Sequence, residues 1–118
     1  MMTSKDETRW PEHPLDLSED ELDIFVKRYD LAVVECWVPY SEHCKKMHGT
    51  VEALSKDMQG KVAFGKVDAR LHHHVPVRFG VKATPTFLLF NHGRLVGRVV
   101  GEMPKEELAE TIDRNIQG

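Results

Sequence analysis

The spacing of apolar residues predicts a helix and then a buried strand in the first third of the chain. Ser18 and Glu21 form a capping-box pattern, and the apolar positions that follow keep to one helical face, which predicts a helix over about residues 19–29. Residues 31–38 read LAVVECWV, a nearly continuous apolar run rich in β-branched residues. Such a run is typical of a strand covered on both faces within a parallel sheet, and Glu35 is the anomaly in it.

The rest of the chain alternates between the same two kinds of element. Pro76 lacks a backbone donor, which predicts that the helix over residues 70–79 is irregular. The link Asn91–Arg94 is short, which predicts that the strands on either side of it form an antiparallel hairpin. The predicted elements are a helix from Cys44 to a glycine stop at Gly60, a strand over 61–68, the irregular helix over 70–79, strands over 86–90 and 95–100, and a last helix that begins at Pro104.

This order of elements predicts the α/β class. It places a mixed sheet of four to five strands between helices on both faces, with right-handed crossovers between the parallel pairs. The 118 residues suffice for one domain and leave no room for a second. We expect residues 1–14, which contain Trp10-Pro11 and His13-Pro14, to form a partly ordered extension with at most a short edge strand. Residues 15–118 form the predicted domain.

Composition narrows the classes of partner. Sixteen Lys and Arg against nineteen Asp and Glu give a net charge of −3, which argues against a surface that binds nucleic acid. The stretch Met1–Arg9 lacks the apolar core of a secretory signal, and no later apolar run is long enough to span a membrane. Two cysteines are too few for the disulfide scaffold of a small secreted domain. We therefore expect a cytoplasmic protein without nucleic-acid or membrane partners. We also expect it to be a monomer.

Motifs at separated places resemble those of the thioredoxin family over about residues 15–118. The stretch VVECWVPYSEHCKK resembles the family's active-site strand and loop, in which an acidic residue, an aromatic residue, Trp, two further residues, an aromatic residue and C-x-x-C follow in order. The stretch GVKATPTFLLF resembles the second active-site loop, where Pro85 would be the cis proline beside the dithiol. Gly93 in the hairpin turn and Gly101 after the last strand also match. The resemblance implies a thioredoxin-like three-layer sandwich.

Ser41 is the departure from the family that changes the chemistry. The tetrad here is Ser41-Glu42-His43-Cys44, so S-x-x-C stands in place of C-x-x-C. In the family the first cysteine is the attacking thiolate, held at a helix N-terminus where backbone amides lower its pKa. A serine hydroxyl stays protonated and cannot form a disulfide with Cys44. This chain therefore cannot cycle between dithiol and disulfide forms by the two-cysteine route.

The resemblance also implies roles for residues near Ser41. Cys44 would be the resolving cysteine, and it is either a residual thiol able to form one mixed disulfide or merely a small apolar residue in a helix. Glu35, costly inside an apolar strand, would be its proton relay, and the alternative is a structural ion pair with Lys66. His43 resembles the histidine of protein disulfide isomerases, but without a cysteine at position 41 it is expected to be an exposed loop histidine.

A shallow apolar groove is expected around the active-site loop. By resemblance it binds an extended segment of a partner protein through backbone hydrogen bonds to Thr84, the residue before Pro85. The residues assigned to this binding site are Trp37, Tyr40, Glu42, His43, Thr84, Pro85 and Gly101. The groove does not depend on Ser41, so peptide binding could persist without redox chemistry.

Neither the other cysteine nor a run of histidines indicates a cofactor or a metal. Cys36 alternates with Glu35 along the strand, so it faces the opposite side of the sheet and is predicted to be a buried structural thiol. His72, His73 and His74 are consecutive, and on one helical turn their side chains diverge instead of converging on one ion. We predict no cofactor and no metal site.

Three functions compete. The first is a thiol-disulfide oxidoreductase for protein disulfide reduction and cell redox homeostasis, in which Ser41, natural or introduced, impairs dithiol exchange. Its partners would be a protein substrate at Trp37 and Pro85 and a reductase. The second is a redox-inactive module, chaperone-like or a scaffold, that uses the groove alone. The presence of Cys44 argues mildly against this function, because a pure binding module does not need the thiol. A glutathione-dependent monothiol enzyme fits least, because such enzymes keep the first cysteine and lose the second.

Overall fold

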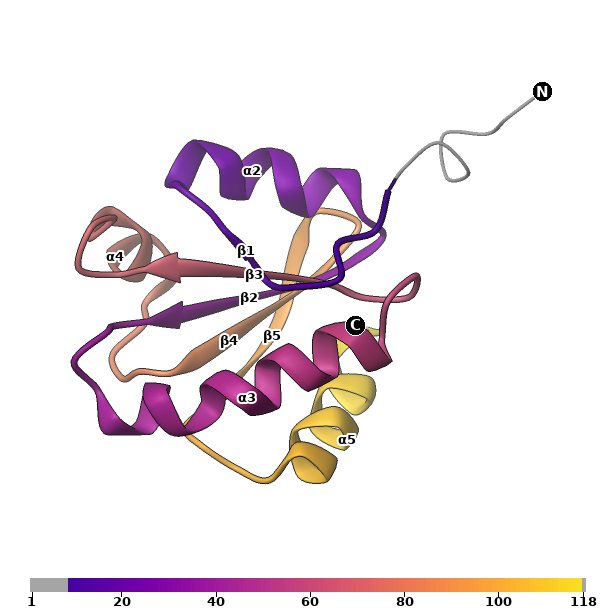
Figure 1. Cartoon of the computed structure of the whole chain (residues 1–118). Helices are drawn as coiled ribbons and strands as arrows, with labels where there is room; N and C mark the ends of the chain where they lie inside the picture. Colours follow the sequence, from indigo (N-terminus) through magenta and orange to yellow (C-terminus); the bar gives the residue numbers. More distant parts are fainter. Residues whose placement is uncertain (1–8, 118) are drawn as a thin grey trace.

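A five-stranded sheet forms the middle layer of the protein (Figure 1). The computed structural model describes residues 9–117. The elements, in chain order, are β1 (Leu15–Asp16), α2 (Glu19–Arg28), β2 (Leu31–Trp37), α3 (Glu42–Asp57), β3 (Ala63–Asp68), α4 (His74–Phe79), β4 (Thr86–Asn91), β5 (Arg94–Val100) and α5 (Lys105–Ile116). The strand order is β1-β3-β2-β4-β5; β1, β3 and β2 are parallel, and β4 is antiparallel to β2 and β5. The predicted α/β class and mixed sheet are confirmed.

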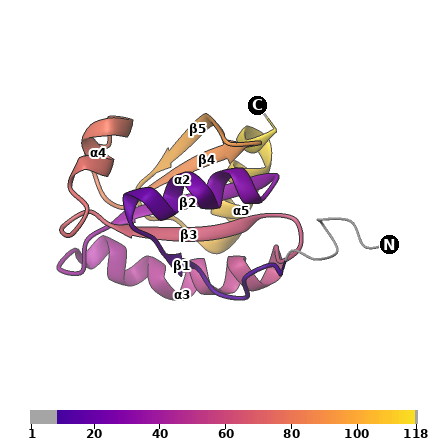
Figure 2. The ribbon, with the colours of Figure 1, turned by 90° about the horizontal axis from the view of Figure 1, so that it is seen from above.

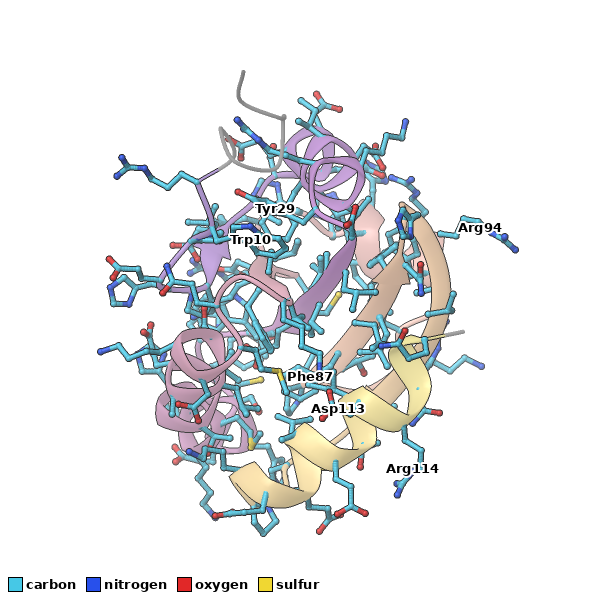
Figure 3. All side chains as sticks on the ribbon, turned by 90° about the vertical axis from the view of Figure 1, so that its right-hand side faces the viewer. Trp10, Tyr29, Phe87, Arg94, Asp113 and Arg114 are labelled. Atoms are coloured by element: carbon cyan, nitrogen blue, oxygen red, sulfur yellow. The ribbon has the colours of Figure 1, made fainter. Side chains whose placement is uncertain are left out.

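Two hydrophobic cores fill the spaces on either side of the sheet. Helices α2 and α4 pack on one face, and α3 and α5 pack on the other (Figures 1 and 2). Alternate residues of β2 serve the two cores, because Val34 faces α2 and Val33 faces α3. Phe87 of β4 lies fully buried in the core under α3 and α5 (Figure 3). A central strand covered on both faces explains the nearly continuous apolar run of β2.

Helix α4 is shorter than the helix predicted over residues 70–79. The backbone N–H groups of Leu71 and His72 donate to the carbonyl of Asp68, which folds this segment into turns instead of a helix. The helix therefore begins at His74. Pro76 then falls in the first turn, where a backbone N–H has no partner within the helix in any case, so the proline does not disturb α4.

The chain before α2 runs along one edge of the sheet. The edge strand β1 pairs with β3 just after residues 1–14, so it lies within the predicted domain and outside the predicted extension. Trp10 packs against Tyr29 with their ring centroids 4.9 Å apart (Figure 3). The Tyr29 hydroxyl donates to the carbonyl of Arg9. The part of the predicted extension at residues 1–8 lies outside the described residues.

Candidate functional site

The loop after β2 places Ser41 and Cys44 at the start of α3, which has 16 residues. Ser41 has extended backbone and is the N-cap of this helix; its Oγ accepts a hydrogen bond from the backbone N–H of Cys44, with 3.3 Å between oxygen and nitrogen. Serine is a preferred N-cap because its oxygen satisfies an amide that has no partner within the helix. This cap was not predicted, although a serine directly before a helical pattern is the signal for one.

Glu35 and Cys36 of β2 face opposite sides of the sheet. Cys36 is fully buried in the core under α2, as predicted, and burial raises the pKa of its thiol to about 12. Glu35 lies on the α3 side with only 3% of its surface exposed. Burial raises the pKa of Glu35 to about 7, and the positive charge of Lys66 opposes this rise. Glu35 is thus a buried carboxyl that changes its charge near neutral pH.

Lys66 stands opposite Glu35 in the β2–β3 ladder, but the two residues do not form the ion pair considered as an alternative. Among residues 9–117 no ion pair includes Lys66. Its Nζ lies 4.2 Å from the centroid of the Trp37 ring, a cation–π contact. Burial therefore keeps the pKa of the Glu35 carboxyl high, since no cation in direct contact offsets it.

A pocket of about 350 Å³ brings Glu35 and Cys44 to one cavity. We call it the Cys44 pocket; it is lined by Glu35, Trp37, Val38, Cys44, Lys45, His48 and Lys66. Cys44 is 5% exposed. A carboxyl with a pKa near 7 in the same pocket as a thiol is suited to proton transfer at neutral pH.

The loop before β4 lies against the end of β5. The Thr84–Pro85 peptide bond is cis, and Pro85 is buried. Its carbonyl accepts a hydrogen bond from the backbone N–H of Gly101, at 2.9 Å. Gly101 has φ 97°, a conformation that favours glycine. Two of the predicted binding residues, far apart in the sequence, are thus joined directly through their backbones.

His43 joins α3 to the segment after β5. Its Nδ1 lies 2.5 Å from Oε1 of Glu102, the residue that follows Gly101. The prediction that His43 lies in a loop is wrong, because His43 belongs to the first turn of α3. The predicted exposure is correct, since its side chain is 67% exposed. The hydrogen bond from His43 holds the pKa of Glu102 below its usual range. Glu102 belongs to no motif, so only the folded chain identifies it.

The Cys44 pocket overlaps the predicted binding site only at Trp37. Of the predicted binding residues, Trp37 lines the pocket, whereas Tyr40, Thr84, Pro85 and Gly101 do not. Tyr40 is 72% exposed, and Glu42 is also exposed. The pocket also includes Lys45, His48 and Lys66, of which the sequence pointed only to Lys66, as a possible ion-pair partner of Glu35. No signal short of the register between β2, β3 and α3 could have placed them together.

The histidine run leads into the start of α4, and His72 lines a neighbouring pocket together with Trp37 and Lys66. His73 is the N-cap and His74 the first residue of that helix, and the centroids of their rings are 5.0 Å apart. Within the described part of the chain, no three His, Cys, Asp or Glu side chains gather into a possible metal cluster. No helix between residues 9 and 117 has both the length and the apolar composition needed to cross a membrane.

The order of elements, the capped helix after β2 and the cis proline before β4 together define a protein of the thioredoxin-fold class. The sequence profile of the thioredoxin family matches residues 13–114, and the chain belongs to this family. It is 33% identical over 99 residues to the chloroplastic thioredoxin M4 of Arabidopsis thaliana, an alignment that covers 83% of this chain and 51% of that one. It is 29% identical over 103 residues to the thioredoxin of Haemophilus influenzae, covering 86% and 96% of the two chains.

Solved structures agree with the sequence comparison. A mutant thioredoxin from Halobacterium salinarum NRC-1 superposes with a TM-score of 0.84 at 25% identity, over 92% of this chain and 96% of that one. The predicted thioredoxin-like sandwich of three layers is therefore confirmed. The chain spans about half the length of the chloroplastic relative and nearly all of the Haemophilus protein.

Proposed function

We propose that this member of the thioredoxin family is a protein-disulfide oxidoreductase of cell redox homeostasis in which Ser41 occupies the position of the attacking cysteine. In this form the chain is impaired in dithiol exchange, because a serine hydroxyl at that position neither ionises near neutral pH nor forms a disulfide. The observation that carries the proposal is the hydrogen bond between Ser41 Oγ and the backbone N–H of Cys44. It supports the view that residue 41 sits where helix amides would stabilise a thiolate.

Cys44 and Glu35 supply the other two roles in this proposal. Cys44 is the resolving cysteine, and Glu35 is the proton relay that serves it. Their common pocket and the pKa of about 7 at Glu35 support these roles, since a relay must change protonation near the working pH. Cys36 is not a substitute for the missing thiol, because it lies in the opposite core.

The proposed partner is an extended segment of a protein substrate. The binding residues in this proposal are Trp37, Tyr40, Glu42, His43, Thr84, Pro85 and Gly101. The hydrogen bond between Gly101 and the Pro85 carbonyl and the exposure of Tyr40 are consistent with a surface that accepts a peptide backbone. A reductase in the cytoplasm would supply the electrons, and the chain would act as a monomer.

Restoring a cysteine at position 41 tests this function. With dithiothreitol as electron donor, Ser41→Cys is expected to reduce insulin disulfides, while the parent chain and Ser41→Ala remain at the background rate. The double variant Ser41→Cys, Cys44→Ser is the matched control, and it should not turn over because no resolving thiol remains. No gain in Ser41→Cys would contradict the proposal and favour the redox-inactive binding module.

A further inference from the structure

The Cys44 pocket presents a thiol and an unpartnered carboxyl to a space that shares only Trp37 with the predicted groove. Glu35 is nearly fully buried and, among the described residues, its carboxyl makes no hydrogen bond and no ion pair. A buried polar group without a partner is costly unless something in the cavity compensates it. The volume of about 350 Å³ is at the lower end of the range for small-molecule sites.

Two lysines and a histidine, which we call the rim, line this pocket together with the carboxyl of Glu35. Lys66 has no carboxylate partner within residues 9–117, and its ammonium lies over Trp37. Lys45 contacts the exposed Glu42 at 3.3 Å, an ion pair of the weak, solvated kind. His48 is exposed and makes no hydrogen bond to the described part of the chain. Because two lysines face one carboxyl in this lining, the pocket favours a ligand that carries negative charge.

We propose that the Cys44 pocket binds an anionic low-molecular-weight disulfide and that Cys44 forms a mixed disulfide with one half of it. The ligand's carboxylates face Lys45, His48 and Lys66, and its sulfur–sulfur bond faces Cys44. This chemistry does not depend on the proposed oxidoreductase activity, and it holds whether or not Ser41→Cys reduces insulin.

The step balances without a further oxidant. The ionised carboxylate of Glu35 takes the proton of the Cys44 thiol, and the thiolate attacks one sulfur of the ligand. The new bond joins Cys44 to that sulfur, and the ligand's own sulfur–sulfur bond breaks. The other half leaves as a thiolate and receives the proton from Glu35. Cys44 is oxidised, and the departing sulfur is reduced.

Intact-mass and peptide-mass measurements on the native chain with glutathione disulfide test the proposal. Cys44 should gain one glutathione, whereas Cys36, fully buried with a thiol pKa of about 12, should remain free. The cationic disulfide cystamine should react more slowly than glutathione disulfide, because the rim repels it. Modification of Cys36 first, no modification of Cys44, or equal rates with the two disulfides would each overturn the proposal.

Variants that remove charge from the pocket test whether the lysines bind the anionic disulfide or whether Cys44 reacts only because its thiol is accessible. The double variant Lys45→Gln, Lys66→Gln should react with glutathione disulfide about tenfold more slowly, since two weak ion pairs are lost. With the neutral 2-hydroxyethyl disulfide, the single variant Lys45→Gln should react at the rate of the parent chain. The double variant should be slowed less than it is with glutathione disulfide, because the charge of Lys66 also lowers the pKa of Glu35. Lys46→Gln is the matched control, because Lys46 follows Lys45 on α3 but does not line the pocket. A slowing by Lys46→Gln equal to that of the double variant would contradict a role for the rim.

A steric variant provides a second, independent readout. His48 is exposed, so His48→Trp enlarges a side chain at the mouth of the pocket without disturbing either core. It should slow the reaction of Cys44 with glutathione disulfide and with 2-hydroxyethyl disulfide alike. Unchanged rates with both reagents would show that the disulfide reaches Cys44 by another route, and the proposed site would be wrong.

Discussion

Ser41 Oγ lies 3.3 Å from the backbone nitrogen of Cys44 and caps the helix that carries this cysteine. The same atom that cannot act as a thiolate therefore satisfies one of the free amides of α3. Replacing Ser41 by cysteine would remove a good helix cap and introduce a reactive sulfur. At residue 41 a side chain that favours redox activity is therefore expected to lower the stability of the helix. Activity and stability can be measured in the same set of variants.

Ser41→Ala is expected to lower the free energy of unfolding by about 1 kcal/mol, because the amide of Cys44 loses its acceptor. Ser41→Asp, which keeps an oxygen at the N-cap, should retain most of the parent's stability. Urea unfolding of the parent and both variants at one pH provides the measurement. If the alanine and aspartate variants were equally stable, the hydrogen bond would not stabilise the helix.

Glu35→Gln should change the pH dependence of stability. In the folded chain the pKa of Glu35 is raised to about 7 from an ordinary value of 4.5, so its proton is bound more tightly in the folded state. The resulting stabilisation is fully present below about pH 4.5 and is lost as the pH rises through 7. The parent should lose up to about 3 kcal/mol over this window, a loss that Glu35→Gln avoids.

Urea unfolding at pH 4.5 and pH 8 measures this effect. The difference in unfolding free energy between Glu35→Gln and the parent should shift in favour of the variant at pH 8. Cys36 adds nothing in this window, because its thiol is protonated in both states until higher pH. Glu42→Gln, at an exposed position, is the matched control and should show no such shift. A difference that is the same at both pH values would contradict the burial argument.

His43→Ala should raise the pKa of Glu102. The hydrogen bond from His43 is the main cause of the low pKa of this carboxyl, and the positive charge of Lys46 contributes less. NMR titration of the Glu102 side chain measures the change directly. His48→Ala, an exposed histidine of the same helix, should leave the titration of Glu102 where it is in the parent. A Glu102 curve unchanged by His43→Ala would show that the contact does not persist in solution.

Phe87→Ala should destabilise the chain by about 3–5 kcal/mol, because it empties a fully buried site between β4 and the helices α3 and α5. Val77→Ala removes an apolar side chain that is 81% exposed and should change stability by less than about 0.5 kcal/mol. Thermal or urea unfolding of the two variants measures both effects. Similar losses in the two variants would contradict the assignment of the core.

Most elements of the fold could be predicted because their signals are local. The capping box at Ser18 and the apolar spacing behind it are complete within a few residues, and the structure has both of them at α2. The start of α4 could not be predicted in this way. It depends on Asp68, whose carbonyl and carboxylate hold the following residues in turns. A helical pattern alone does not show which backbone groups are already hydrogen-bonded.

In the candidate site, too, residues that belong to local motifs could be predicted from the sequence, and contacts between distant segments could not. Ser41, Cys44 and Pro85 belong to motifs with fixed spacing, and they could be found without coordinates. His43 could be found too, but not its partner, because 59 residues separate it from Glu102. The N-cap role of Ser41 also has a local signal, a serine directly before a helical pattern, although the predicted helix begins only at Cys44.

The amino-acid sequence alone determined the order of the elements, the family and the residue at position 41, because each of these is written in neighbouring residues. The tertiary structure decided that Lys66 lies over Trp37 instead of pairing with Glu35. It also decided that Glu35 and Cys44 share a pocket with Lys45, His48 and Lys66. Strand register and the packing of α3 on the sheet bring these side chains together, and such contacts arise only when distant segments meet.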